Sequence, residues 1–385
     1  MIRKKVMIAF GTRPEAIKLA PVILGMQKDR GRFEPYVLAT GQHDEMLSQV
    51  LHLFEIKPDR NLEIMTAGQT LFDITTRALK GIESVLKESR ADIVLVQGDT
   101  TTAFAAALAA YYEQIPVAHV EAGLRTHNKY NPFPEEINRR LVTVLADLHF
   151  APTVFSSRQL HKEGIPDKDI FVTGNTIIDA LLMSVRKDYV FKDNRLNTLD
   201  YQTKRVIVLT MHRRESFGEP MRNILSAVRK IAEVYSQDVE VVFPVHFNPE
   251  VRETVRRSLG GQKYENIHLI DPLDYQAFVQ MMDRAFIILT DSGGIQEEAP
   301  TLGKPVLVLR ETTERPEGID AGVSKLVGTD PDKIYNEVRR LMEDPSAYER
   351  MATAVSPYGD GRAAERILNI LSTVDIHGTR KSKAD

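Results

Sequence analysis

The chain has 385 residues, 43% of them hydrophobic and 27% charged, and its formal net charge is -3. These values are typical of a globular protein with two domains, and they exclude a general electrostatic attraction to nucleic acid or anionic membranes. The lack of cysteine excludes disulfides, a thiolate nucleophile and a cysteine-ligated metal, and the apolar runs are too short to span a membrane, so we expect a cytoplasmic protein.

Short apolar runs alternate with longer segments of helical period. The runs cover residues 6–10, 36–39, 93–96, 117–120, 170–172, 206–210, 239–243, 286–290 and 306–309. This order predicts parallel strands covered by helices on both faces, hence two doubly wound, Rossmann-like α/β domains. We place the first domain at 1–175 plus a returning C-terminal helix within 361–385, and the second at 176–360, with the polar stretch 188–204 leading into its sheet.

Acidic residues follow two strands of the first half directly. Asp99 comes after the run 93–96, Glu121 comes after 117–120, and a loop stiffened by prolines leads to Glu135 at the start of a helix. Since ligands bind at the carboxyl ends of parallel strands, we expect these carboxylates to converge, and converging acids are typical of proton transfer. Alternatively, Asp99 caps a helix, and Glu135 and Glu136 complement a helix N-terminus.

The first strand is followed by Gly11 and by two cations, Arg13 and Lys18, in the first turns of a helix. Gly11 permits a tight turn, and Pro14 suits the first helical turn. The two cations could reach over the edge of the sheet, or they could be solvated surface charges.

The segment 286–302 predicts a phosphate site. An apolar strand breaks into Asp291-Ser292-Gly293-Gly294 and then opens a helix. The glycines allow close approach of a ligand, and the first amides of the helix offer unpaired donors and partial positive charge. Glu298, about one turn further on, could accept hydrogen bonds from ribose hydroxyls, which favours a nucleoside diphosphate. An ordinary helix start is the alternative.

Basic residues follow three strands of the second half. His212 and Arg213 come after 206–210, where they could neutralise and protonate a leaving diphosphate, although a basic surface loop is the alternative. His246 follows 239–243, and Arg315 follows 306–309 as a further anion ligand. Phe278 could pack on a nucleobase, or it could be an ordinary core residue.

Seven motifs in this order resemble the bacterial non-hydrolysing UDP-N-acetylglucosamine 2-epimerases, and the match runs nearly end to end. They are Gly11-Thr12-Arg13-Pro14-Glu15, Gly98-Asp99-Thr100-Thr101, His119-Val120-Glu121-Ala122-Gly123-Leu124-Arg125, Pro134-Glu135-Glu136-Ile137-Asn138-Arg139, His212-Arg213-Arg214-Glu215, Asp291-Ser292-Gly293-Gly294 and Thr313-Glu314-Arg315-Pro316-Glu317. The resemblance implies a glycosyltransferase-B type fold with an interdomain cleft, and reversible conversion of UDP-N-acetylglucosamine to UDP-N-acetylmannosamine.

The chemistry of the sugar limits the ways in which carbon 2 can be inverted. No carbonyl acidifies the proton at carbon 2 of the sugar, and the chain has no nicotinamide fingerprint, so no cofactor is expected. The route that the resemblance implies is elimination of UDP to a 2-acetamidoglucal, followed by re-addition. The resemblance also implies the roles of the site residues. The catalytic set is Asp99, Glu121, Glu135 and His212, and the substrate-binding set, with Phe278 added from its position, is Arg13, Lys18, Phe278, Ser292, Gly293, Gly294, Glu298 and Arg315, with no metal.

Some relatives bind a second UDP-N-acetylglucosamine as an activator, and the resemblance places that site at Gln42, His43, Gln69, Glu136, Arg213 and His246. Gly68 stands where close relatives often have arginine, so one contact of this site differs here. A homodimer is also implied by the resemblance.

Three other functions remain open. A hydrolysing epimerase would use the same intermediate but release UDP and free N-acetylmannosamine. A glycosyltransferase of the same fold would need an acceptor pocket instead of three acids. A nucleotide-sugar sensor would need no acids at all.

Overall fold

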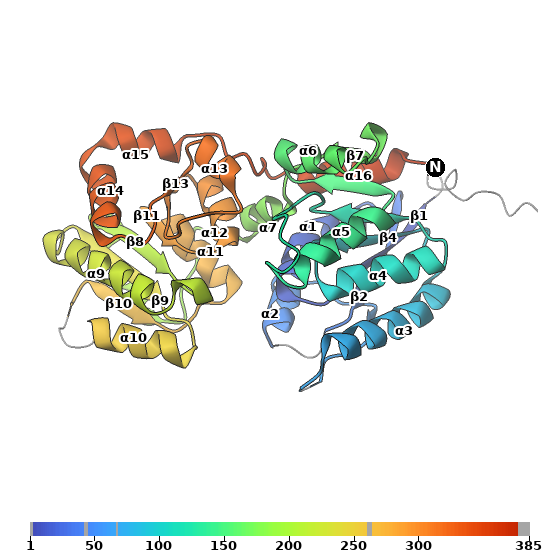
Figure 1. The fold of residues 1–385 in the computed structure, drawn as a ribbon, viewed down its shortest axis with the longest axis horizontal. Coiled ribbons are helices and arrows are strands. Elements are labelled where there is room, and N and C mark those ends of the chain that lie inside the picture. The colour runs from blue at the N-terminus through green and yellow to red at the C-terminus, as the bar shows by residue number, and fades with distance from the viewer. Residues whose placement is uncertain (1–2, 42–44, 67, 260–263, 376–385) are drawn as a thin grey trace, which may run out of the picture. The chain divides into compact units, whose positions relative to one another are not determined.

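The computed structural model describes residues 3–41, 45–66, 68–259 and 264–375. The chain divides into two compact units, unit 1 comprising Met1–Leu182 and Tyr358–Asp385, and unit 2 comprising Met183–Pro357. Each unit is a parallel sheet with helices on both faces (Figure 1). None of the helices in the described ranges has the length and apolar character needed to cross a bilayer.

Unit 1 has a seven-stranded sheet in the order β3-β2-β1-β4-β5-β6-β7. Its strands are β1 (Lys4–Phe10), β2 (Phe33–Ala39), β3 (Arg60–Asn61), β4 (Ile93–Gln97), β5 (Val117–Val120), β6 (Leu148–Ala151) and β7 (Ile170–Val172). Its helices are α1 (Arg13–Lys28), α2 (Glu45–Leu53), α3 (Leu71–Ser89), α4 (Thr101–Tyr112), α5 (Glu135–Leu145), α6 (Val154–Lys162), the 3-10 turn η1 (Asp167–Asp169), α7 (Thr176–Ser184) at the division, and α16 (Ala363–Thr373).

Unit 2 has a six-stranded sheet in the order β10-β9-β8-β11-β12-β13. Its strands are β8 (Arg205–Thr210), β9 (Val239–Pro244), β10 (Ile267–Ile270), β11 (Ile287–Thr290), β12 (Val306–Val308) and β13 (Ser324–Leu326). Its helices are α8 (Asn194–Asn197), η2 (Arg214–Ser216), α9 (Glu219–Val234), α10 (Pro249–Leu259), α11 (Tyr275–Arg284), α12 (Gly293–Glu298), η3 (Ala299–Leu302), α13 (Pro316–Asp320), α14 (Pro331–Glu343) and α15 (Pro345–Ala352).

The prediction of two doubly wound parallel domains is confirmed, since every strand pair in both sheets is parallel. Each predicted apolar run contains a strand, whereas β3, β6, β10 and β13 were not predicted. Those four are short or carry polar residues, such as His149 in β6 and His268 in β10, so they do not read as apolar runs. Residues 376–385, the last part of the stretch expected to hold the returning helix, lie outside the described residues.

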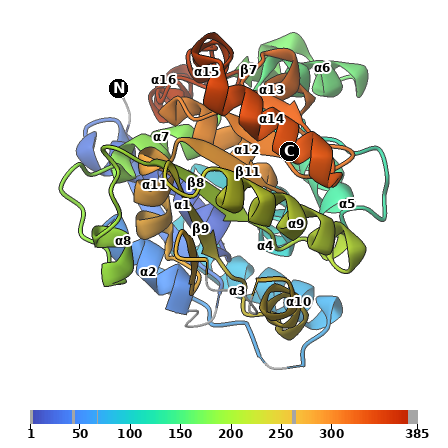
Figure 2. The same ribbon diagram turned by 90° about the vertical axis from the view of Figure 1, so that its left-hand side faces the viewer.

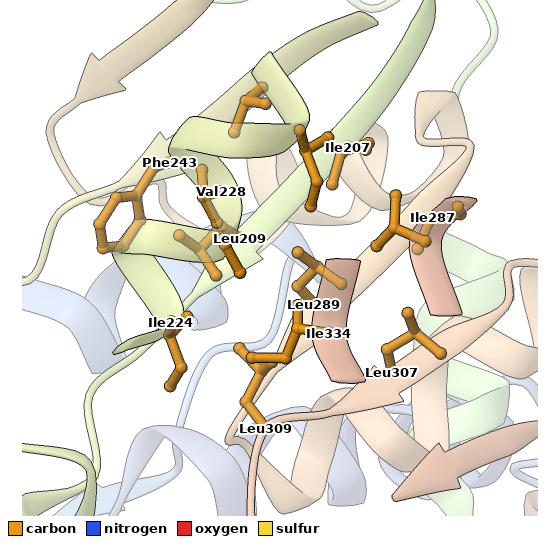
Figure 3. Packing of buried hydrophobic residues seen from close by; sticks show 14 of the residues in the cluster. Ile207, Leu209, Ile224, Val228, Phe243, Ile287, Leu289, Leu307, Leu309 and Ile334 are labelled. Carbon is orange, nitrogen blue, oxygen red and sulfur yellow. The ribbon is translucent and has the colours of Figure 1, made fainter. Parts of the chain in front are cut away.

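Each sheet is buried because its strands are apolar on both faces. In unit 1, Ile82 of α3 and Ala106 of α4 belong to the same buried cluster as Val96 of β4. In unit 2, Ile207 and Leu209 of β8 pack in the cluster shown in Figure 3, which also contains Val228 of α9. Helix α14 lies beside α9 over this cluster, as Figure 2 shows.

Helix α16 completes unit 1 although it comes from the end of the described chain. The Asp179 carboxylate accepts hydrogen bonds from the first amides of α16, at 3.1 Å from Ala363 and 2.9 Å from Ala364. The helix packs on α1 so closely that a Cβ on Gly25 would lie 2.5 Å from Leu368 Cδ1. Unit 1 is therefore assembled from two separate stretches of chain.

Candidate active site

The two sheets share one topological feature that positions the candidate site residues. The strand order reverses between β1 and β4 in unit 1, and between β8 and β11 in unit 2. Loops that leave two such neighbouring strands run to opposite sides of the sheet, which opens a crevice at the carboxyl ends of the strands. Four of the motifs singled out in the sequence follow these strands, two follow the neighbouring strands β5 and β12, and one opens α5. Because the two units are described separately, each half of the candidate site is built here on its own.

The loop after β1 is fixed by a buried carboxylate. Glu15, 1% exposed, accepts hydrogen bonds from the amides of Gly11 at 3.1 Å and Thr12 at 2.8 Å. Its other oxygen accepts from the Thr100 hydroxyl, at 2.7 Å, on the loop after β4. Burial raises the pKa of Glu15, and these hydrogen bonds oppose that rise. Glu15 thus ties together the two loops on either side of the crevice.

Glu121 directly follows β5 and points into a set of polar side chains. Its carboxylate contacts the Lys18 ammonium and the Gln97 amide, and it accepts a hydrogen bond from Asn175 Nδ2 at 3.2 Å. Its backbone has a φ of 67°, a left-handed conformation that is costly for a residue with a side chain. Strain of this kind is concentrated at functional sites, which agrees with a role in the chemistry.

Asp99 follows β4, the strand that pairs with β5, and the turn before it approaches Glu121. A Cβ on Gly98 would lie 3.5 Å from Glu121 Oε2, and the Gly98 carbonyl is 2.7 Å from His119 Nε2. The Asp99 carboxylate forms an ion pair with Arg139 of α5, and its side chain is 25% exposed. A partly exposed acid therefore follows β4, and a buried acid follows the neighbouring strand β5.

Helix α5 brings the third acid to the same end of the sheet. The Asn138 side-chain amide donates to the Asp99 carbonyl at 3.0 Å, which docks α5 against the β4 loop. Glu135 lies four residues before Arg139, so it occupies the same face of the helix as the arginine that pairs with Asp99. Glu135 Oε2 is buried and has no hydrogen-bond partner among the described residues. A buried carboxylate oxygen without a partner is costly unless a ligand or proton satisfies it.

The two predicted cations of the first half have different surroundings. Lys18 is engaged by Glu121, with 16% of its side chain exposed. The Arg13 guanidinium lies 3.5 Å from the sulfur of Met46. Lys18 therefore belongs to the acid cluster, and Arg13 lies at its edge.

In unit 2, one buried carboxylate organises the loop after β8. Asp291 is 0% exposed, and its Oδ2 accepts from Ser216 Oγ at 2.8 Å and from the amides of Arg213 at 3.0 Å and His212 at 3.1 Å. Its Oδ1 lies 3.3 Å from His212 Nδ1. Desolvation lowers the pKa of His212, the charge of Asp291 opposes that shift, and Arg213 and His246 lower the pKa further. The imidazole is therefore biased towards its neutral form.

Two guanidinium groups lie over the start of α12. A Cβ on Gly293 would lie 3.5 Å from Arg213 Nη2 and 3.9 Å from Arg315 Nη2, so both groups reach the start of the helix at van der Waals distance. Glu297, 2% exposed, forms an ion pair with Arg315. Glu314 lies 3.3 Å from Arg213 and 2.7 Å from Arg310. Although burial raises the pKa of Glu314, hydrogen bonding to Arg310 and the charges of Arg213 and Arg310 lower it to about 2.

Glu298 faces the first turn of α12. A Cβ on Gly294 would lie 4.0 Å from both Glu298 Oε2 and Ser292 Oγ. The other oxygen of Glu298 accepts from the Tyr275 hydroxyl at 3.0 Å. Burial raises the pKa of Tyr275, as do the charge of Glu298 and this bond. Phe278, one turn further along α11, is partly buried, and its contact with a nucleobase stays a prediction.

The residues predicted for an activator have varied surroundings. Glu136 is 1% exposed and accepts from the amides of Thr126 at 3.0 Å and His127 at 3.1 Å, so its carboxylate holds a loop in this structure. Gln69 is partly buried and its side chain accepts a hydrogen bond from the Thr66 amide at 2.9 Å, and His246 is exposed beyond β9. Gln42 and His43 lie outside the described residues.

Sequence reasoning missed the partners that hold these side chains. Gln97, Asn175, Arg139, Asp291, Glu297 and Glu314 each contact a predicted site residue. Two of these partners could have been found from the sequence, because Arg139 lies one helical turn from Glu135 and Asp291 comes directly after a strand. The others depend on the directions of side chains that are far apart in the sequence.

Comparison with known proteins shows the family to which the chain belongs. The family described as UDP-N-acetylglucosamine 2-epimerase matches residues 26–372. The chain belongs to this family. It is 51% identical to UDP-N-acetylglucosamine 2-epimerase of Bacillus subtilis, covering 100% of this chain and 99% of that protein. It is 53% identical to the Salmonella typhimurium enzyme, covering 97% and 99%.

A crystal structure of UDP-GlcNAc 2-epimerase from Neisseria meningitidis, bound to UDP-GlcNAc, has a TM-score of 0.85 and 49% identity, with 95% of this chain and 99% of that chain covered. These likenesses confirm the predicted family, the glycosyltransferase-B type of two-domain fold and the class of the enzyme, an isomerase that acts as a UDP-N-acetylglucosamine 2-epimerase.

Proposed function

We propose that this epimerase inverts carbon 2 reversibly, without hydrolysis, by eliminating UDP and adding it back through a 2-acetamidoglucal. One observation carries the proposal: acids gather at the strand ends of unit 1, while cations gather at the strand ends of unit 2. Acids suit transfer of a carbon-bound proton, and cations suit a departing diphosphate. The long family match supports the same assignment.

In the first step a carboxylate removes the proton from carbon 2. The electron pair of that bond forms the double bond between carbons 1 and 2, as the bond from carbon 1 to the UDP oxygen breaks. In the return step UDP attacks carbon 1 and a proton reaches carbon 2 from the other face. The acids and bases in this proposal are Asp99, Glu121 and Glu135. A proton transfer by a positioned side chain typically raises the reaction rate about 10²- to 10⁴-fold.

UDP is retained between the two steps by unit 2. Arg315 and the Gly293 amide bind the diphosphate, with Ser292 and Gly294 beside them, and Glu298 accepts from the ribose. His212 assists departure of the diphosphate. The guanidinium groups lie over Gly293, and donors fixed in this way cost little reorganisation when charge develops. Arg13 and Lys18 support the sugar end.

The proposal is tested by incubating the protein with UDP-N-acetylglucosamine in deuterated water and following the sugar by NMR. We expect UDP-N-acetylmannosamine that carries deuterium at carbon 2 and is still attached to UDP. Protium retained at carbon 2 of the epimer would contradict proton abstraction. Free N-acetylmannosamine with released UDP would instead identify a hydrolysing enzyme.

We also infer a second UDP-N-acetylglucosamine site and a homodimer, both from the family resemblance. Gln69, Glu136, Arg213 and His246 are the described residues assigned to the second site. If the site activates the enzyme, pure UDP-N-acetylmannosamine turns over slowly until a trace of UDP-N-acetylglucosamine is added; equal rates with and without that trace would contradict it. Light scattering should give twice the chain mass of 43.4 kDa.

A further inference from the structure

Asp291 is the most completely buried charged group next to the proposed reaction site of unit 2. It directly ends β11 and precedes Ser292, and it accepts three hydrogen bonds through Oδ2, from Ser216 and from the amides of His212 and Arg213. Its Oδ1 lies 3.3 Å from the His212 amide and 3.3 Å from His212 Nδ1. The carboxylate thus holds the backbone of His212 and lies within ion-pair distance of its ring.

A carboxylate can accept hydrogen bonds but cannot donate them, so its position decides where the imidazole proton lies. The proton of neutral His212 is favoured on Nδ1, facing Asp291, and Nε2 is left as the nitrogen that exchanges its proton. The His212 side chain is 46% exposed, so the ring remains open to solvent or to a ligand. In the described part of the chain, the other charges that act on His212 are those of Arg213 and His246, and both disfavour the imidazolium.

We propose that Asp291 is a positioning residue that keeps the Nδ1–H of His212 directed at itself, so that Nε2 carries the proton exchanged with the diphosphate. For departure of UDP the neutral ring first takes up a solvent proton at Nε2. As the bond between carbon 1 and oxygen breaks, that proton passes to a phosphate oxygen of UDP, and the ring returns to its neutral form with the proton on Nδ1. Re-addition of UDP returns that proton. This inference rests on the proposed role of His212 in UDP departure.

The first test needs no variant. In protein labelled with ¹⁵N at histidine, the signals of His212 report which ring nitrogen carries the proton. We expect the neutral ring to be protonated at Nδ1. Protonation at Nε2 instead would overturn the proposal, and this result does not depend on whether any variant folds.

The second test is Asp291→Asn, which keeps the shape of the side chain and removes its charge. We expect kcat to fall about 10²-fold or more, as is typical when a general acid is lost, and the pKa of His212 measured by NMR to fall. The matched control is Glu240→Gln. Glu240 also contacts a histidine, His268 at 2.7 Å, but it lies near the start of β9, at the opposite end of the sheet. That variant should shift the His268 signals and leave those of His212 unchanged.

A double variant separates a positioning role from a merely structural one. In a His212→Gln background, Asp291→Asn should lower kcat little further, because both changes remove the same proton transfer. A full additional loss would mean that Asp291 acts independently of His212, and unchanged His212 signals in Asp291→Asn would also overturn the proposal. If wild-type protein forms no deuterated epimer, the proposed function fails rather than this inference.

Discussion

Unit 1 and unit 2 both collect charge at the carboxyl ends of parallel strands, but with opposite sign. In unit 1 the acids are central: Glu135 Oε2 is buried without a hydrogen-bond partner among the described residues, and the cation Lys18 pairs with Glu121. In unit 2 the central groups are the guanidiniums of Arg213 and Arg315, and carboxylates hold them. The same fold thus gathers acids in one unit and guanidinium groups in the other, which suits the proton transfer and the anion binding proposed above.

Because the two units carry opposite charge, we expect substitutions in them to change different kinetic quantities. An acid that moves a proton acts in the transition state, so its loss lowers kcat. A guanidinium that binds diphosphate acts on the ligand throughout, so its loss weakens binding as well. A unit 1 variant that loses UDP affinity, or a unit 2 variant that loses only kcat, would contradict this division of roles.

The largest expected effect is that of Asp99→Asn. The change keeps the shape of the side chain but removes the proton acceptor, so kcat should fall about 10²- to 10⁴-fold with UDP affinity nearly unchanged. Turnover assays and calorimetric titration with UDP measure the two quantities. Asp147→Asn is a control, because Asp147 precedes β6, where its carboxylate accepts from the Val117 amide at 2.8 Å. A matching loss of UDP affinity in Asp99→Asn would remove the distinction between the units.

The next effect in size is that of Arg315→Ala. Hydrogen bonds to charged groups contribute about 1.5–3 kcal/mol, so the UDP dissociation constant should rise about 10- to 100-fold. Arg350→Ala is the control, since that side chain is 67% exposed on α15. Unaltered UDP binding in Arg315→Ala would rule out this arginine as a diphosphate ligand.

A third prediction compares a buried histidine of unit 1, His119, with an exposed one, His161. His119 of unit 1 is 0% exposed, and its pKa is lowered to about 3 from 6.5, chiefly by desolvation. Between these values the unfolded chain binds the proton and the folded one does not, so stability is lost as the pH falls below 6.5. From about pH 7.5 to about pH 5 this costs about 2 kcal/mol.

In His119→Gln this acid-dependent loss should disappear from the free energy of unfolding measured in urea, although the variant is less stable at neutral pH. His161→Gln, which alters a histidine with 41% of its side chain exposed, should keep the loss. An unchanged pH slope in His119→Gln would show that His119 is not kept neutral by burial.

The smallest effect is expected for Glu314→Gln. The change removes a partner of Arg213, which weakens UDP binding, and it also removes a negative charge that repels diphosphate, which strengthens UDP binding. The two effects on the UDP dissociation constant therefore oppose each other. Partly exposed ion pairs contribute about 0.2–1 kcal/mol, hence we expect less than about a fivefold change in the UDP dissociation constant. A loss as large as that in Arg315→Ala would mean that Glu314 does more than hold Arg213.

Much of the fold could be predicted because long apolar runs mark buried parallel strands. Residues 6–10 and 206–210 read as strands from composition alone, and β1 and β8 lie there. The short β3 and the polar β13 become strands through pairing with a neighbour, at Leu38 with Arg60 and at Val306 with Ser324. Pairing partners far away in the sequence cannot be read from local pattern.

The positions of candidate site residues followed from strand ends, but their surroundings did not. Asp99 and Glu121 were expected at neighbouring strand ends and lie there, while their catalytic roles stay predictions. The burial of Glu136 against the amides of Thr126 and His127 depends on how a loop folds back, which no spacing reveals. Asp291 was read as part of a turn, whereas its carboxylate points back to the loop after β8.

The origin of α16 carries a consequence for how the protein is made. Ribosomes deliver the chain from its amino end, so α1 emerges early and waits for a partner helix that is synthesised after all of unit 2. During that interval the surface around Gly25 that Leu368 later covers is exposed to chaperones and proteases. A messenger cut short after Pro357 would yield a finished second unit attached to an incomplete first one.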